Sequence, residues 1–486
     1  MSSVIERTLR GGLGLFSADV IAKAMGFLFI VIASRYLGPS EFGVLALGLS
    51  VFGVARNLSA FGLPNTIQRF LSGEGEKEVG QVYAALLVVG ALGTVLGAGT
   101  LYLTAPALAS MVFSKPVLIG PLRVFSIGTI GAVIFMIIRA VLRAQEQIAD
   151  VVQIDTIRSV GKVLLLGGVI AVGARSATAA AWGVAASFIP AVALAGYKVR
   201  QIHFRPIVKN LTPQLKRVLG YTAPLVVVGF SYFLAQQADR LMLGWLADTV
   251  KVGIYTTTST LAMVMSALHG ALVSIFMPIA SEAYREGSKE RMSDAYVFIS
   301  RWMGVVNGLA LLAFAGGGLW ILHIFGPEYA TDTTYLVLVI LSTLYFVGTW
   351  VGPTGALLQM SDGHRIEFIN TIIFVITNIG LNYVLIIEYG VIGAALATLG
   401  SGVLRNAIQL IEIGVWYGVT PIRGRNIVDL AATLLGMTAL FLVPQGELRA
   451  LLAGIVMVVL GMYAFLSASE EERRVVHGLL AQFSTA

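Results

Sequence analysis

Positively charged side chains lie inside segments of this chain that are otherwise apolar enough to cross a membrane. Arg158 and Lys162 are four residues apart, so they share one face of a helix, and Asp155 lies one turn earlier on that face. A charge at the middle of a bilayer costs about 2.5–3.5 kcal/mol on insertion scales, so such residues usually face a protein-lined or watery cavity. The positive excess favours an anion site over internal pairing or snorkelling. Phosphate oxygens would suit these donors.

Other spans carry charges as well. Asp19 and Lys23 are four residues apart in the first span, where they either neutralise each other or contact a substrate or coupling ion. Arg56 lies near the cytoplasmic end of the second span, within reach of snorkelling, and Arg405 is the main deep cation of the second half. The predicted substrate-binding residues are Lys23, Arg56, Arg158, Lys162 and Arg405, the predicted ion-coupling or charge-pairing residues are Asp19 and Asp155, and His269 and Glu412 are further candidates.

The composition is that of a polytopic membrane protein, with 57% hydrophobic and 12% charged residues and a mean hydropathy of +0.85. A spanning helix needs about 20 apolar residues. We therefore predict an all-α integral membrane protein, with twelve or thirteen spans as alternatives to about 14. The fourteen predicted spans are 13–33, 43–63, 82–103, 117–138, 152–172, 177–197, 218–239, 253–279, 302–324, 334–357, 366–387, 391–415, 427–443 and 448–467.

Loop charge predicts the orientation of these spans. Twenty-one Lys and Arg residues fall on the side that holds both termini, against six on the other side. The positive-inside rule places that richer side in the cytoplasm. The net charge of +7 is then a signal of topology rather than of nucleic-acid binding. We expect a multi-pass protein of the cell (plasma) membrane with cytoplasmic N- and C-termini.

A weak internal repeat predicts two lobes. Ala179-Ala180-Ala181 recurs at an offset of 214 residues as Gly393-Ala394-Ala395. An offset of six spans gives both copies the same orientation, which implies a parallel pseudo-twofold axis along the membrane normal. The predicted organisation is an N-lobe of helices 1–6 (1–197), a cytoplasmic linker (198–217), a C-lobe of helices 7–12 (218–415), helices 13 and 14 (416–467) and a cytoplasmic tail (468–486).

Motifs of catalysis and cofactor binding are missing from the sequence. It has no Walker A loop, no Gly-x-Ser-x-Gly elbow and no His-Glu-x-x-His, and its five histidines show no metal-ligand spacing. It also has no cysteine. We predict that the chain is not an enzyme and needs no cofactor or metal.

Three segments carry a family resemblance, namely residues 33–43, residues 238–244 followed by 252–255, and residues 378–398. In these segments, and in its span count, the chain resembles the polysaccharide transporter (oligosaccharide flippase) family of the multidrug/oligosaccharidyl-lipid/polysaccharide exporter superfamily. The resemblance implies two six-helix lobes plus two C-terminal helices. It also implies a flippase that moves a polyprenyl-(pyro)phosphate-linked oligosaccharide from the cytoplasmic to the outer leaflet by alternating access.

The resemblance also implies partners and a departure. The expected partners are the lipid-linked oligosaccharide, membrane lipid and a coupling ion, Na⁺ or H⁺, with a functional monomer and no nucleic acid. Related lipid II flippases carry cavity arginines on helices one, two and eight. In this chain the counterparts on helices one and two are Lys23 and Arg56, and helix eight departs from the pattern by offering His269 instead of an arginine. The alternatives are a cation-coupled multidrug antiporter of the same superfamily, a membrane glycosyltransferase or ligase, and an accessory membrane protein.

Overall fold

The computed structural model describes residues 2–71, 76–201, 206–208, 211–360 and 364–470; side chains before Val20, and a few later ones inside helices, lie outside the description. The described residues form helices α1 to α16 and short 3₁₀ and π turns, and they contain no strand. The predicted all-α class is confirmed. Most of the predicted tail, 471–486, lies outside the described residues.

The chain divides into two compact units, Met1–Thr257 and Thr258–Ala486. Helices α1 to α8 belong to the first unit, α9 runs across the boundary, and α10 to α16 belong to the second. The lobe boundaries drawn from the repeat stay a prediction. The helices are α1 (Ser2–Ser59), α2 (Leu63–Leu71), α3 (Glu76–Ala107), α4 (Ile119–Ala144), α5 (Ile148–Ala171), α6 (Ala177–Ala186), α7 (Phe188–Val199), α8 (Leu211–Leu246), α9 (Thr249–Met263), α10 (Ala267–Arg285), α11 (Lys289–Leu322), α12 (Asp332–Val351), α13 (Thr354–Met360), α14 (His364–Tyr417), α15 (Gly424–Phe441) and α16 (Glu447–Leu466).

Each predicted span coincides with a helix, with half of a kinked helix or with a pair of short helices. Eight helical stretches in the described part of the chain are long and apolar enough to cross a membrane, and two of them, Val20–Leu71 and Arg365–Tyr417, each hold two predicted spans. Helix α5 is not among the eight, since it carries Asp155, Arg158 and Lys162. The charges that lower its hydropathy are the ones that suggest a site.

Two glycines turn the chain between consecutive spans. Gly38 in α1 has φ 73° and Gly390 in α14 has φ 58°, values that side chains with a Cβ rarely adopt. Helices α1 and α14 therefore each consist of two helical halves joined at a glycine, and Pro39 directly follows the first of these turns. Both turns lie inside segments that carry the family resemblance.

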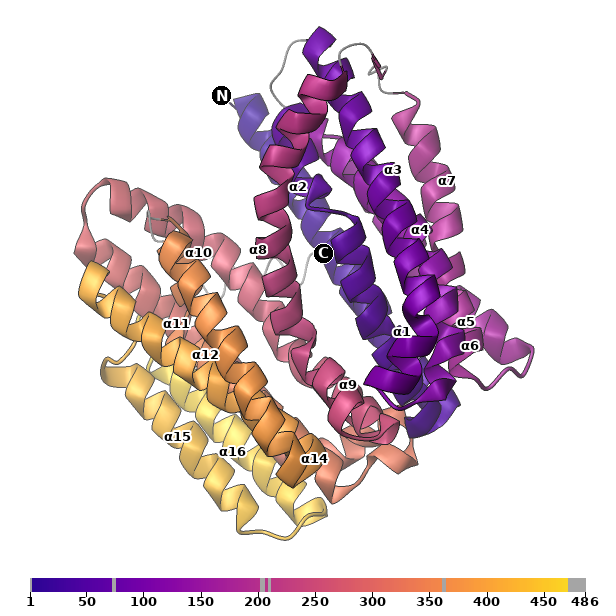
Figure 1. Cartoon of the computed structure of the whole chain (residues 1–486). Helices are drawn as coiled ribbons and strands as arrows, with labels where there is room; N and C mark the ends of the chain where they lie inside the picture. Colours follow the sequence, from indigo (N-terminus) through magenta and orange to yellow (C-terminus); the bar gives the residue numbers. More distant parts are fainter. Residues whose placement is uncertain (1, 72–75, 202–205, 209–210, 361–363, 471–486) are drawn as a thin grey trace. The chain divides into compact units, whose positions relative to one another are not determined.

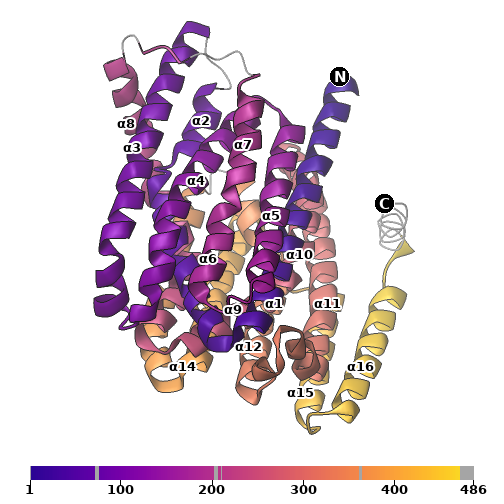
Figure 2. The ribbon, with the colours of Figure 1, turned by 90° about the vertical axis from the view of Figure 1, so that its right-hand side faces the viewer.

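The first unit is a bundle of neighbouring helices. Helix α4 packs against α3, α6 and α7, helix α5 packs against α1, α6 and α7, and α8 packs against α1 and α3. Figures 1 and 2 show α3 to α7 running side by side. A buried apolar cluster that includes Leu63, Val82, Val133 and Val218 joins α2, α3, α4 and α8. This packing holds α5 and α8 each against α1, as the site below requires.

A backbone contact joins α1 to α9 within the first unit. A Cβ atom added to Gly43 would lie 1.7 Å from the carbonyl oxygen of Thr249, and one added to Gly253 would lie 2.5 Å from the carbonyl oxygen of Pro39. Only glycine permits so close an approach. Gly43 and Gly253 lie in two different segments of the family resemblance, so this contact gives both segments a structural reason.

In the second unit, α11 packs against α12, α15 and α16, which Figure 1 shows beside one another. Arg301 of α11 donates to Asp429 of α15 at 2.8 Å, and their side chains are 2% and 6% exposed. Arg301 also donates to the carbonyl oxygen of Ala464 in α16 at 3.2 Å. A buried ion pair thus ties α15 to α11, and a hydrogen bond ties α16 to the same arginine.

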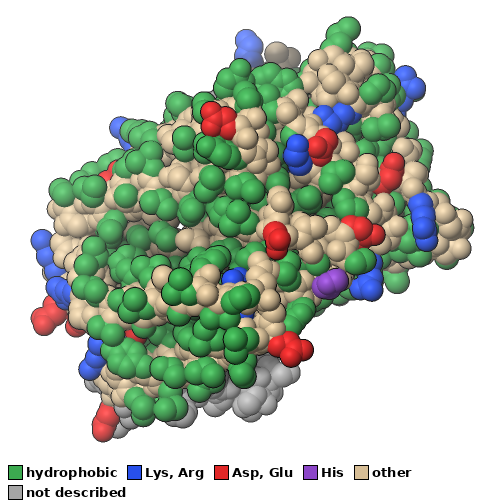
Figure 3. All heavy atoms as spheres, turned by 90° about the horizontal axis from the view of Figure 1, so that it is seen from below, with side chains coloured by type: hydrophobic (Ala, Val, Ile, Leu, Met, Phe, Trp, Pro, Cys, Tyr) green, Lys and Arg blue, Asp and Glu red, His purple; other side chains and the backbone are tan. Residues whose placement is uncertain are grey.

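Large apolar side chains are exposed along many helices. Leu103, Leu164, Val415 and Leu435 are among those more than two-thirds exposed. Figure 3 shows hydrophobic side chains over much of one face, with charged side chains scattered between them. Surfaces of this kind are stable against lipid, and together with the apolar helices they identify a multi-pass membrane protein.

Candidate functional site

Three of the predicted site residues surround one cavity in the first unit. Arg56 comes from the last turn of α1, and Arg158 and Lys162 come from α5. The cavity has a volume of about 180 Å³. Its other lining residues are Phe29, Ile30, Leu49, Phe52, Gly53, Val184, Phe233 and Gln237, which belong to α1, α6 and α8. The helix packing of this unit thus brings together cations about a hundred residues apart in sequence.

These three cations form no ion pair in the described part of the chain. None of them takes part in an ion pair or hydrogen bond with a described residue, and the Nε atoms of Arg56 and Arg158 are buried without an acceptor. A buried donor without an acceptor costs about 1–3 kcal/mol, and more when it is charged. An anion in the cavity would satisfy all three side chains.

Phenyl rings lie beneath the cations instead. The guanidinium of Arg158 lies 4.7 Å from the ring centre of Phe188, the Lys162 Nζ lies 4.4 Å from that of Phe29, and Arg56 lies 5.8 Å from that of Phe52. A cation–π contact contributes about 0.5–2 kcal/mol. That is less than the cost of one charge at mid-bilayer, about 2.5–3.5 kcal/mol. The rings support the cations without neutralising them.

Asp155 is directed to a different partner. Its carboxylate accepts a hydrogen bond from the Nε of Arg139, on α4, with 2.9 Å to each oxygen. The charge of Asp155 is thereby engaged outside the cavity, which it does not line. Of the stripe predicted on α5, Arg158 and Lys162 line the cavity and Asp155 forms an ion pair between helices.

The structure describes the two predicted residues of the first span, Lys23 and Asp19, only in part. Lys23 is exposed on α1 and is not among the residues that line the cavity, although Phe29 and Ile30 of the same helix are. The side chain of Asp19 lies outside the described ones. The predicted roles of Lys23 and Asp19 therefore stay predictions.

Arg405 occupies a neutralising environment in the second unit. It forms an ion pair with Glu367, which is on the other half of α14 and is only 8% exposed. Gln409 also donates to Glu367, at 2.6 Å, and Thr354 of α13 donates to Gln409 at 2.7 Å. Arg405 is thus held in a polar network of its own unit, in contrast to the cations of the cavity.

Sequence reasoning missed Glu367 in this network, and also the hydrogen bond from Asn370 to Glu412, which measures 2.7 Å. For the pair of Asn370 and Glu412, the signal that could have found it is the turn at Gly390. In a helical hairpin, residues at similar distances from the turn lie at similar depths, and Asn370 and Glu412 lie 20 and 22 residues from Gly390. His269, on α10, lines neither the cavity of the first unit nor the second cavity, which is described next.

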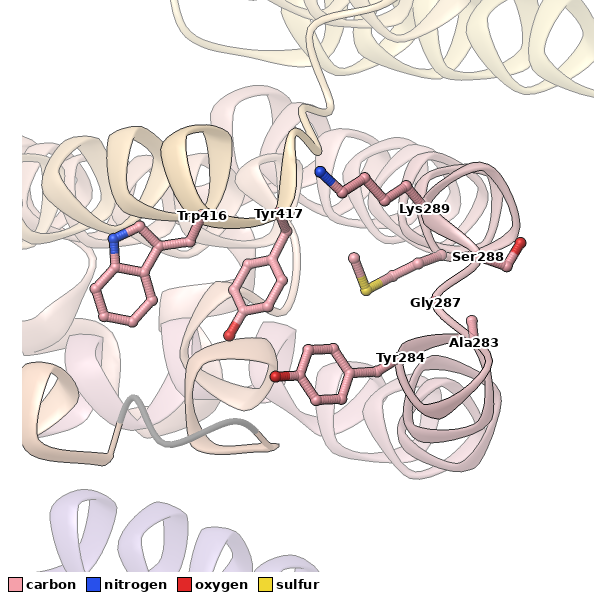
Figure 4. A pocket seen from close by; sticks show the side chains of 8 residues that line it. Ala283, Tyr284, Gly287, Ser288, Lys289, Trp416 and Tyr417 are labelled. Atoms are coloured by element: carbon pink, nitrogen blue, oxygen red, sulfur yellow. The ribbon is translucent and has the colours of Figure 1, made fainter.

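A second cavity, of about 390 Å³, lies in the second unit where α10 ends, α11 begins and α14 ends. Figure 4 shows the hydroxyl groups of Tyr284 and Tyr417 facing each other, with Lys289 nearby. Their rings are 6.1 Å apart, edge to face. Aromatic residues with a lysine are typical of membrane–water interfaces. This cavity is larger, but its Lys289 is exposed, whereas the three cations of the first cavity are partly buried.

The described residues offer no cluster of metal ligands. They include no group of three or more His, Asp or Glu side chains close enough to hold a metal ion. The cavity of the first unit instead offers positive charge and N–H donors, which bind an anion electrostatically.

The fold and the cavity together define a multi-pass membrane protein with a cavity lined by three cations. Residues 8–284, more than half of the chain, match the family described as "Polysaccharide biosynthesis protein". The chain belongs to this family, and the resemblance drawn from its three segments to the polysaccharide transporter family is confirmed.

Relatives and solved structures agree with this family. The "Probable low-salt glycan biosynthesis flippase Agl15" of Haloferax volcanii is 21% identical over 398 residues, which cover 80% of each chain. The structure "Lipid II flippase MurJ, inward closed conformation" has a TM-score of 0.75 at 12% identity, covering 93% of this chain and all of that one. An inward-facing multidrug resistance MATE family transporter of the MOP superfamily has a TM-score of 0.68 at 16% identity, covering 82% of this chain and 94% of that one. At these identities the two structures show the fold alone.

Proposed function

We propose that this chain is a flippase that moves a polyprenyl-(pyro)phosphate-linked oligosaccharide from the cytoplasmic to the outer leaflet by alternating access. The observation that carries the proposal is the set of three unpaired cations, Arg56, Arg158 and Lys162, around a cavity among apolar helices. A phosphate-bearing, sugar-rich headgroup has to cross the hydrocarbon core while its lipid tail stays in lipid. A cationic cavity would shield that headgroup.

The family and the relatives support this proposal. The chain belongs to the "Polysaccharide biosynthesis protein" family, the Haloferax volcanii relative is named a probable glycan biosynthesis flippase, and one structure of similar fold is a lipid II flippase. None of these names describes a catalyst of bond making. We accordingly assign transport rather than catalysis to the chain.

The proposed setting is the plasma membrane with both termini in the cytoplasm. In this orientation an inside-negative potential assists the outward movement of an anion, by about 2.3 kcal/mol per charge per 100 mV. A coupling ion, Na⁺ or H⁺, would act by binding the two conformations with different affinity. The predicted partners remain the lipid-linked oligosaccharide and membrane lipid, bound by a functional monomer.

The site charge argues against the multidrug antiporter, although that class shares the fold. Organic cations would meet Arg56, Arg158 and Lys162 in the cavity, without a carboxylate among the residues that line it. Like charges repel more strongly in a low-dielectric site than in water. The flippase is the function that this cavity favours.

The test is translocation by purified protein in proteoliposomes. A polyprenyl-pyrophosphate-linked oligosaccharide is placed in one leaflet, and its arrival in the other is followed by cleavage with an impermeant glycosidase. The double variant Arg158→Ala/Lys162→Ala should abolish translocation. The matched control is Arg123→Ala, because Arg123 is an exposed cation of α4 that lies over Tyr102 and away from the cavity lining. Translocation by the double variant at the wild-type rate would overturn the proposal.

A further inference from the structure

Gln237 brings a neutral hydrogen-bonding group to the cationic cavity. It lies on α8, and among the described residues that line the cavity it is the one uncharged side chain with hydrogen-bonding atoms. Its neighbour Gln236 is exposed and does not line the cavity. The two glutamines therefore form a natural pair of test and control positions.

The orientation of the Gln237 amide is set by Arg240 and Ser50. The Nη1 of Arg240 lies 3.1 Å from the Gln237 Oε1, and the hydroxyl of Ser50 on α1 lies 3.0 Å from the same atom. A guanidinium can only donate, so the atom facing Arg240 has to be the amide oxygen. The hydroxyl of Ser50 also lies 3.1 Å from the carbonyl oxygen of Ala46, so its single hydrogen is shared between two acceptors.

This orientation leaves the other end of the amide for a ligand. With Oε1 held by Arg240 and Ser50, the two hydrogens on Nε2 have no acceptor among the described residues. An amide N–H seeks an oxygen acceptor, and the three cations around the same cavity select an anionic one. The non-bridging oxygens of a phosphate group supply both the charge and the acceptor.

We infer that Gln237 is a specificity-determining residue that donates an Nε2–H bond to a phosphate oxygen held by Arg56, Arg158 and Lys162, and that Ser50 and Arg240 are its positioning residues. The inference rests on the proposed function and adds a division of roles. The cations supply attraction, which depends weakly on direction. The amide supplies a directional bond, which favours one orientation of the phosphate in the cavity.

The test is the affinity of the purified full chain for inorganic pyrophosphate, measured by titration calorimetry. Gln237→Leu removes the donor and should weaken binding roughly tenfold, as expected for one lost hydrogen bond to a charged group. Gln236→Leu should leave the affinity unchanged. Gln237→Glu, which replaces the donor by a carboxylate, should weaken binding more than Gln237→Leu.

The positioning roles need a readout that simple loss of packing would not change. Ser50→Ala frees the amide to rotate, so it should weaken binding less than Gln237→Leu while the melting temperature without ligand stays the same, and Ser50→Thr should restore the affinity. If Gln237→Leu lowers only the melting temperature and not the affinity, Gln237 is structural and the inference is wrong. Arg158→Ala separates the two proposals. If this variant still binds pyrophosphate, the phosphate site itself is refuted. If Arg158→Ala loses pyrophosphate binding while Gln237→Leu binds as the wild type does, only the role of Gln237 is refuted.

Discussion

Arg139 and Asp155 form an ion pair between α4 and α5, with the arginine Nε 2.9 Å from each carboxylate oxygen. Asp155 lies one helical turn before Arg158 and is the carboxylate that the sequence places on its face. Asp155 forms its ion pair with Arg139 and does not line the cavity. The cavity lining thus stays positively charged because Asp155 pairs with Arg139 and not with one of the three cations.

Removal of this ion pair should leave the anion site intact. Asp155→Asn should lower the free energy of unfolding by no more than about 1 kcal/mol, because the Arg139 side chain is 35% exposed and such pairs contribute little. Pyrophosphate affinity should stay at the wild-type level or rise slightly. A clear loss of affinity, measured by calorimetry, would mean that Asp155 belongs to the site.

A lysine should replace Arg158 of α5 only in part. Arg158→Lys should retain part of the translocation rate, since the charge stays, but it loses the planar fork that binds phosphate through two bonds. Arg158→Ala should retain none. The measurement is the initial rate of translocation in proteoliposomes, and equal rates for the lysine and alanine variants would show that charge is not what Arg158 provides.

The buried ion pair between Arg301 and Asp429 should be important for stability. Asp429→Ala leaves a buried guanidinium without its carboxylate, and breaking such a pair costs about 3–5 kcal/mol. Thermal unfolding in detergent would record the loss. The control is Glu282→Ala, which breaks an exposed pair with Arg291 and should cost about 1 kcal/mol or less. Similar losses in both variants would contradict the structure.

The backbone contact between α1 and α9 predicts a steric effect. Gly43→Ala places a Cβ atom on the carbonyl oxygen of Thr249, so it should destabilise the protein by about 1–3 kcal/mol. Gly26→Ala, in the other half of α1, is the control, because nothing lies within 4 Å of its added Cβ. Melting temperatures of the two variants decide the point, and an unchanged value for Gly43→Ala would refute the contact.

Sequence periodicity and hydropathy located the spans because membrane helices satisfy their backbone within each segment. The shared face of Arg158 and Lys162 also followed from helix geometry alone. What did not follow was the rotation of each helix in the bundle. That rotation places Arg56 beside α5, turns Asp155 to Arg139 and leaves Lys23 away from the cavity. The pairing of Arg405 with Glu367 depends on how the two halves of α14 pack across Gly390, which one sequence does not reveal.

The phenyl rings beneath Arg158, Lys162 and Arg56 have a consequence for turnover. A carrier that works by alternating access has to release its cargo and return empty. Were these cations held by carboxylates between cycles, each new cargo would first have to displace a salt bridge. A ring face attracts a cation without using any of its N–H groups. In the proposed transport cycle, the three cations of the empty protein would therefore lie on the rings with every N–H donor available for the next cargo.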